Sequence, residues 1–194
     1  MSKESRDWLE KIARLDYIRP EDIPDIDLYM DQVTTFMETE LKMTKRTPDD
    51  KIMTKTMINN YTKNKLLPPP EKKKYSKDHM YMLIFIYYYK SIMSISDIQK
   101  ITGPLGEFCF GKDKEHKGEL GLSGVYESMF DMMHEYYYSM KDNIEKVEEM
   151  TRLSFPEEEG EKGDFLRKLS LITMLCYDVF MRKQMIETII DEMK

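Results

Sequence analysis

Apolar residues recur along most of the chain at intervals of three and four, which is the spacing of one face of an α-helix. Few stretches show the strict alternation that is typical of strands. We therefore expect an all-α chain with at most a minimal β element. The predicted helices span residues 3–18, 28–42, 54–65, 76–91, 94–103, 124–151 and 164–192.

Breaks between these patterns predict the organisation of the chain. Residues 1–24 form an amphipathic helix, with Trp8, Ile12 and Leu15 on one stripe beside Leu9, and then a linker broken by prolines. Residues 25–103 form the first folded domain. Residues 104–123 form a glycine-rich loop, and residues 124–194 form a C-terminal helical region.

The predicted helix at 54–65 has two contrasting faces. Thr54 suits the N-cap, because its hydroxyl can accept a hydrogen bond from an amide of the first turn. Met57, Ile58 and Tyr61 fall on the apolar face. The other face is polar and carries Lys55, Thr56, Asn59, Asn60 and Lys63.

A stiff basic segment follows this helix. Pro68, Pro69 and Pro70 cannot continue a helix and impose an extended path. Lys72, Lys73 and Lys74 come next, and Tyr75 can pack the segment back on the body. Ser76 then suits the N-cap of the next helix, and Ser94 with Asp97 forms a capping-box start for the one after it.

Charge is distributed unevenly. The chain carries a net charge of −6, yet residues 42–90 contain twelve Lys or Arg and four acids, which leaves +8 there and −14 elsewhere. A basic segment inside an acidic protein is the electrostatic pattern of a local polyanion site. The alternative is a solvated lysine-rich face without a partner.

These features favour double-stranded DNA as the partner. Asparagine can bond adenine at two points in the major groove, and lysine can bond guanine or phosphate. Lysines on a stiff protrusion suit phosphates that flank the groove. The predicted DNA-binding residues are Lys55, Thr56, Asn59, Asn60, Lys63, Lys72, Lys73, Lys74 and Tyr75.

The same segment resembles the MerR-like winged helix-turn-helix. Leu66, Leu67 and Pro68 match the end of that fold's recognition helix, and Tyr75 with Ser76 matches the end of its wing. The resemblance implies a supporting helix at 28–42, a recognition helix at 54–65 and a basic wing. Residues 28–33 and 54–61 also resemble a bacterial family known as domain of unknown function 1836.

The sequence departs from the MerR-like pattern at three places. Asn59 stands where the broader family usually has a DNA-contacting arginine, and Lys65 stands where it has a glycine. The segment at 43–53 is longer than the usual turn between the two helices.

The C-terminal region predicts a helical hairpin. The pattern at 164–192 is apolar over much of the helix circumference, so that helix needs more than one partner. We expect a homodimer, which would supply two half-sites on DNA. A candidate effector pocket comprises Met129, Met133, Tyr136 and Tyr137, although core packing with a dimer contact is the simpler explanation for these residues.

No constellation of residues indicates catalysis, so we expect no enzyme, no metal and no cofactor. The three histidines are not at metal-ligand spacing, and Cys109 and Cys176 lie far apart, as in a reducing cytoplasmic setting. No segment predicts a signal peptide or a membrane span. Two other functions stay open: a module that binds an acidic partner protein, and a small-molecule sensor in the C-terminal helices.

Overall fold

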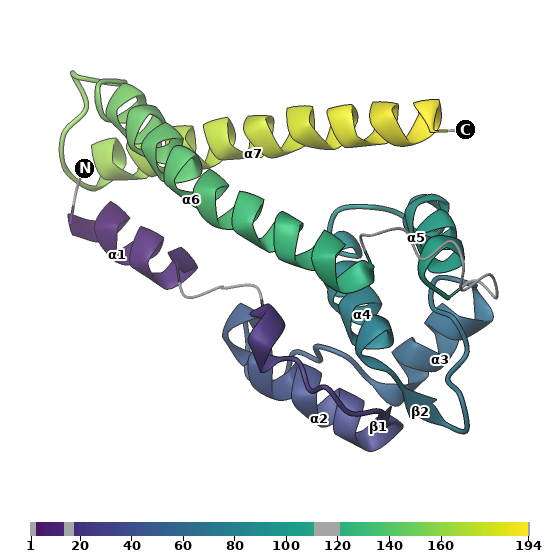
Figure 1. The fold of residues 1–194 in the computed structure, drawn as a ribbon. Helices are drawn as coiled ribbons and strands as arrows, with labels where there is room; N and C mark the ends of the chain where they lie inside the picture. The colour runs from purple at the N-terminus through teal and green to yellow at the C-terminus, as the bar shows by residue number, and fades with distance from the viewer. Residues whose placement is uncertain (1–2, 14–17, 111–120, 194) are drawn as a thin grey trace. The chain divides into compact units, whose positions relative to one another are not determined.

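The computed structural model describes residues 3–13, 18–110 and 121–193, and its α-helices and strands are labelled in Figure 1. It is mainly helical, as the periodicity predicts, with one two-stranded antiparallel ribbon. The elements in order are α1 (Lys3–Ala13), the 3-10 turn η1 (Pro20–Asp22), β1 (Leu28–Tyr29), α2 (Met30–Glu40), η2 (Lys42–Thr44), α3 (Lys55–Lys63), β2 (Lys74–Tyr75), α4 (Lys77–Tyr89), α5 (Ile95–Phe110), α6 (Leu122–Arg152) and α7 (Gly160–Glu192).

The chain divides into two compact units. The ribbon unit comprises residues 15–130 and 190–194, and the hairpin unit comprises residues 1–14 and 131–189. The boundary that the sequence suggests at the glycine-rich loop falls inside the ribbon unit. Most of that loop, residues 111–120, lies outside the described residues.

Helix α4 forms the centre of the ribbon unit. Its residues 79–86 are all buried, which fits a helix that is apolar over its whole circumference. Around it lie the apolar faces of α2, with Val33 and Met37 buried, and of α3, with Ile58 buried. Tyr126 from the start of α6 completes the core, where its hydroxyl donates to the carbonyl of Ile18 at 2.6 Å.

The long connection between α2 and α3 is anchored at both ends. The Asp50 carboxylate accepts hydrogen bonds from the backbone amides of Arg46 and Thr47, each at 2.9 Å, and so closes a local turn. Ile52 and Met53 then enter the core with exposures of 2% and 4%. The eleven-residue segment that looked too long for a turn is therefore a loop that contributes to the core.

Helix α5 corrects the expectation that the helix ends at Gly103 and Pro104. It continues to Phe110 with Pro104 in its interior. Thr102 is buried at 1% exposure and its hydroxyl donates to the carbonyl of Ile98 at 3.0 Å, while Leu105 and Phe110 pack against the core. Tertiary packing thus outweighs the low helix propensity of glycine and proline.

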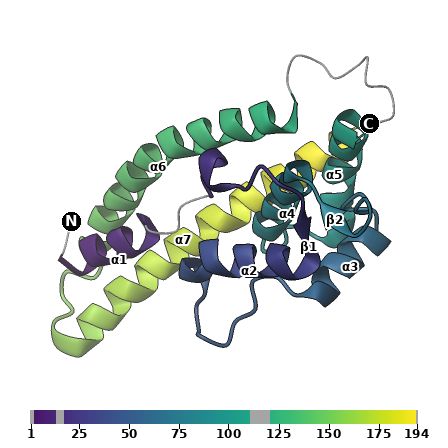
Figure 2. The same cartoon turned by 60° about the horizontal axis from the view of Figure 1, so that its bottom comes forward.

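In the hairpin unit, α6 and α7 are joined by the loop at 153–159 and fold back as a helical hairpin, as predicted (Figure 2). Helix α1 is described over Lys3–Ala13, where Leu9 is buried and Trp8, which the sequence places on the apolar stripe, is 39% exposed. Several large apolar side chains of α7 stay exposed: Phe165, Leu169, Ile172, Val179 and Phe180.

Candidate nucleic-acid interface

Helix α3 is short, and specific hydrogen bonds fix both of its ends. At its start the Thr54 side chain accepts from the amide of Met57 at 3.2 Å, which confirms the predicted N-cap. At its end the amide of Leu66 donates to the carbonyl of Tyr61 at 2.9 Å, and that of Lys65 to Thr62 at 3.1 Å. These two bonds make a Schellman motif, which terminates the helix at a defined residue.

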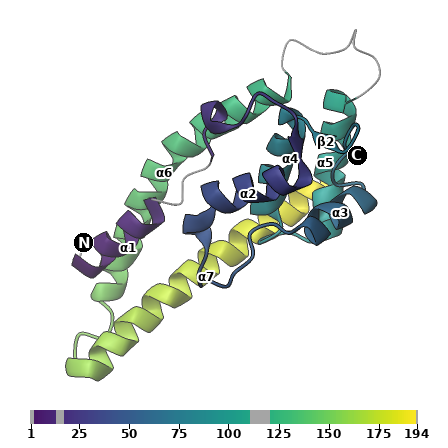
Figure 3. The ribbon, with the colours of Figure 1, turned by 90° about the horizontal axis from the view of Figure 1, so that it is seen from below.

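Packing of α3 leaves its predicted polar face open. Ile58 and Tyr61 are buried at 0% and 6% exposure, so the helix is held from one side. Figure 3 shows α3 at the edge of the ribbon unit, beside the ribbon of β1 and β2. The exposed residues of the helix are Lys55, Thr56, Asn59, Asn60 and Lys63, the same set that the sequence predicts for DNA contact.

One lysine of this face has a partner within the protein. Lys55 forms an ion pair with Asp31 on α2, and both side chains are largely exposed. An exposed pair of this kind contributes at most about 1 kcal/mol and is screened by salt. Lys55 is therefore partly neutralised in the free protein, whereas Lys63 forms no ion pair among the described residues.

The basic segment after α3 forms a minimal hairpin. Leu28 pairs with Tyr75 and Tyr29 with Lys74, so β2 returns to the residues that precede α2. At the start of β2 the amide of Lys74 donates to the carbonyl of Glu71 at 2.8 Å. Residues 71–74 therefore form a two-residue hairpin loop, with Lys72 and Lys73 at its tip.

The backbone of this loop is unusual for lysine. Lys72 has φ of 49° and Lys73 has φ of 67°, the geometry of a type I′ turn, in which Asn-Gly is the preferred pair. Lys65, at the end of α3, has φ of 59° where helices usually place glycine. A non-glycine residue in this region costs about 1 kcal/mol or more. Three exposed lysines therefore occupy positions that disfavour them.

The other two wing residues differ from these lysines in their surroundings. The Lys74 ammonium lies 5.2 Å from the centroid of the Tyr29 ring, a cation–π contact that holds it near the ribbon. Tyr75, which the sequence places among the DNA-contacting residues, is only 3% exposed. Its ring packs edge-on against His79 at 5.6 Å, so its contribution is to hold the wing on the body.

His79 couples the wing to α4. Its Nδ1 accepts from the backbone amide of Ser76 at 3.1 Å and pairs with the Ser76 hydroxyl at 2.8 Å, which completes a capping box. The imidazole is 3% exposed and its Nε2 has no hydrogen-bond partner. Burial lowers the pKa of His79, because the charged ring is poorly solvated there.

The residues of the predicted effector pocket lie along α6. Met129 packs against the core of the ribbon unit, whereas Met133 and Tyr137 are partly exposed in the hairpin unit. Tyr136 is 51% exposed and accepts a hydrogen bond from Arg182 of α7, whose guanidinium lies 5.9 Å from the tyrosine ring. A pocket at these residues stays a prediction.

Sequence reasoning did not include Lys65 among the site residues. The one signal for it was that Lys65 stands where the MerR-like pattern has a glycine. Sequence reasoning also missed the left-handed conformations of Lys72 and Lys73, because a pair of lysines is no signal for a type I′ turn. Lys65 adds a further exposed cation beside the face of α3.

The fold thus defines a mainly helical protein with a ribbon-supported, exposed and well-capped short helix. The family model described as domain of unknown function (DUF1836) matches residues 18–129, and the chain belongs to this family. The matched segment covers nearly all of the main segment of the ribbon unit. Neither the curated proteins nor the solved structures contain a match to the chain. None of the described helices combines the length and the apolar character that crossing a membrane requires.

Proposed function

We propose that this protein is a sequence-specific DNA-binding transcriptional regulator, with α3 in the major groove and the hairpin loop at Lys72 and Lys73 on phosphates. One observation carries the proposal. The exposed face of α3 joins two amide side chains, Asn59 and Asn60, to lysines, and it lies beside a loop tipped by two further lysines. Base edges and phosphates call for this combination.

The backbone geometry supports an electrostatic role for these lysines. Lys65, Lys72 and Lys73 are exposed and unpaired among the described residues, so none of their side chains gains an ion pair or hydrogen bond that offsets the left-handed backbone. Glycine or asparagine would be more stable at each position. A strained residue without a structural gain is a reason to infer a function, and phosphate binding is the function that needs the charge.

We further propose that the ribbon unit uses the MerR-like winged helix-turn-helix arrangement. In it α2 supports α3, and the hairpin loop at residues 71–74 is a minimal wing. The antiparallel pairing of residues 28–29 with 74–75 supports this reading, because it ties the loop to the start of the supporting helix. The buried contacts of Val33, Met37 and Ile58 in one core hold α2 and α3 together.

We propose a homodimer as the DNA-binding form. The large apolar side chains that α7 leaves exposed support this, because exposed apolar clusters on soluble proteins usually mark contacts with a partner. A twofold dimer would present two copies of α3 to an inverted repeat.

Selection of bound fragments from a random DNA pool by the full-length protein tests the proposal, with affinity then measured against salt. We expect an enriched inverted repeat and a steep loss of affinity with salt. Asn59→Ala and Asn60→Ala should relax sequence preference, while Thr39→Ala, an exposed change on α2, serves as the matched control. The absence of enrichment even at low salt would refute DNA binding and leave the basic surface to an acidic protein.

A further inference from the structure

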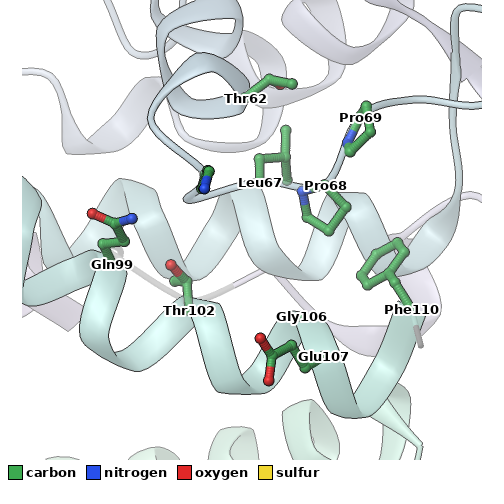
Figure 4. Close-up of a pocket in the computed structure, with 11 residues that line it drawn as sticks. Thr62, Leu67, Pro68, Pro69, Gln99, Thr102, Gly106, Glu107 and Phe110 are labelled. Atoms are coloured by element: carbon green, nitrogen blue, oxygen red, sulfur yellow. The ribbon is translucent and has the colours of Figure 1, made fainter.

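A groove of about 500 Å³ lies in the ribbon unit between the end of α3, the segment Leu67–Pro69 and α5 (Figure 4). Its size falls in the range of small-molecule sites. Figure 4 shows Pro68 and Phe110 toward one end and Gln99 at the other. The remaining lining residues are Thr62, Lys65, Thr102, Gly103, Gly106 and Glu107.

Two glycines of α5, Gly103 and Gly106, line this groove. Within a helix each glycine costs about 1 kcal/mol relative to alanine. Neither Gly103 nor Gly106 has a positive φ that would require glycine. Close packing does not require it either: a Cβ at Gly106 would lie 3.6 Å from Pro68 and 3.8 Å from Met82, and one at Gly103 would meet nothing within 4 Å. Alanine would therefore fit at either position, and only a larger side chain would fill the groove.

The groove carries one positive and one negative group on different walls. Lys65 belongs to the turn after α3, and Glu107 belongs to α5. Neither side chain forms an ion pair among the described residues, and the Gln99 amide forms no hydrogen bond there. Both charges are therefore available to an occupant.

Part of the groove lining is apolar and rigid. The rings of Pro68 and Pro69 form one side, and Phe110 adds an aromatic face. Phe110 itself is supported by His79, whose ring centroid lies 4.7 Å from its own. Rigid apolar walls with a few polar groups at the margins are typical of small-ligand sites.

We propose that this groove binds a small zwitterion with an apolar side group, namely an α-amino acid with an aromatic or branched side chain. Its carboxylate pairs with Lys65, its ammonium pairs with Glu107, and its side group packs against Pro68 and Phe110. Because Thr62 lies in the last turn of α3 and Lys65 in the turn that follows it, the occupant touches the helix that we propose to read DNA.

Binding of L-phenylalanine to the full-length protein, measured by ligand-observed NMR without DNA, tests this proposal independently of the proposed function. A ligand of this size should bind with Kd on the order of 1 mM or tighter. Phenethylamine lacks the carboxylate and 3-phenylpropanoate lacks the ammonium. Each should bind about tenfold more weakly, because each leaves one charged contact unmade.

Variants locate the site. Gly106→Leu fills the groove and should abolish binding, whereas Gly106→Ala adds a Cβ at ordinary contact distance and should preserve it. Lys65→Gln should remove the preference for L-phenylalanine over phenethylamine and keep its preference over 3-phenylpropanoate. Glu107→Gln should do the reverse. Circular dichroism of each variant checks that the fold is kept.

Three results would overturn the proposal. The first is that L-phenylalanine shows no saturable binding at a concentration of about ten times the expected Kd. The second is that L-phenylalanine, phenethylamine and 3-phenylpropanoate bind equally well. The third is that a folded Gly106→Leu variant binds L-phenylalanine as well as the parent does. Failure of DNA selection alone leaves this inference intact, because the binding measurement contains no DNA.

Discussion

Replacing Lys72 with asparagine and Lys73 with glycine should stabilise the protein and weaken its binding to DNA. Both lysines have positive φ at the tip of the hairpin loop, where the Asn-Gly pair is preferred. The double variant therefore relieves backbone strain and removes two positive charges in one step. Opposite changes in stability and affinity are the signature of residues kept for binding.

The gain in stability follows from the two φ values. Relief of strain at the two positions is worth about 2 kcal/mol, at about 1 kcal/mol each. Glycine at position 73 returns about 0.4–1 kcal/mol, because the unfolded chain gains freedom. The net increase in the free energy of unfolding is about 1 kcal/mol, or roughly 2–4 °C in Tm for a chain of this size.

The loss of affinity follows from counterion release. The slope of log K against log salt is negative, and each lost phosphate contact makes it shallower by about 0.9, so the loss of two contacts makes it shallower by about 1.8. Extrapolated from 1 M reference salt to about 0.15 M, that difference corresponds to roughly 30-fold weaker binding. The loss should be the same on every DNA sequence, because phosphates carry no sequence information.

Thermal unfolding and fluorescence anisotropy at several salt concentrations measure the two effects. A control with glutamine at both positions removes the charges without relieving the strain, so it should lose affinity and gain no stability. Arginine at both positions should keep affinity. If the Asn-Gly variant is stabilised and binds DNA as well as the parent, the lysines are merely tolerated and the wing is not a phosphate contact.

Three further changes test the supports of this site. Burial lowers the pKa of His79 in the folded state, so the unfolded state takes up a proton first and the free energy of unfolding falls as the pH drops below about 6.5. His79→Gln keeps an acceptor for the capping box but cannot take up this proton. In urea titrations the variant should therefore lack that loss of stability. Thr54→Ala should lower the urea midpoint by the equivalent of about 1 kcal/mol, because α3 loses its N-cap. Tyr126→Phe should destabilise by about 1–3 kcal/mol, since the buried carbonyl of Ile18 loses its donor, and an unchanged midpoint would mean that water replaces it.

Local rules predicted the start of each helix around the site. The N-caps at Thr54 and Ser76 and the capping interaction of Ser94 with Asp97 all follow from side chains within three residues of the bond they make. The part that His79 takes in the Ser76 capping box was not predicted. The polar face of α3 was predictable for the same reason, because helical periodicity alone decides which residues lie opposite Ile58 and Tyr61.

Features that depend on tertiary contacts were not predictable in this way. Glycine and proline at 103 and 104 indicate a helix end, yet burial of Thr102 and packing of Phe110 carry α5 through them. The groove against Pro68 exists only because α5 continues, so it could not be inferred from local patterns. Likewise the pair of Lys55 with Asp31 joins residues that are distant in sequence.

Because the structure shows which lysines are already paired, the slope of log K against log salt can indicate how many copies of the protein bind one DNA site. Lys55 is paired with Asp31 and Lys74 is held over Tyr29, so four lysines near the proposed interface remain free among the described residues: Lys63, Lys65, Lys72 and Lys73. At about 0.9 per contact, one copy should give a slope of about −3.6 and a dimer on an inverted repeat about −7. A slope near −3.6 on an enriched inverted repeat would therefore argue that only one copy engages its half-site, whatever the apolar surface of α7 binds.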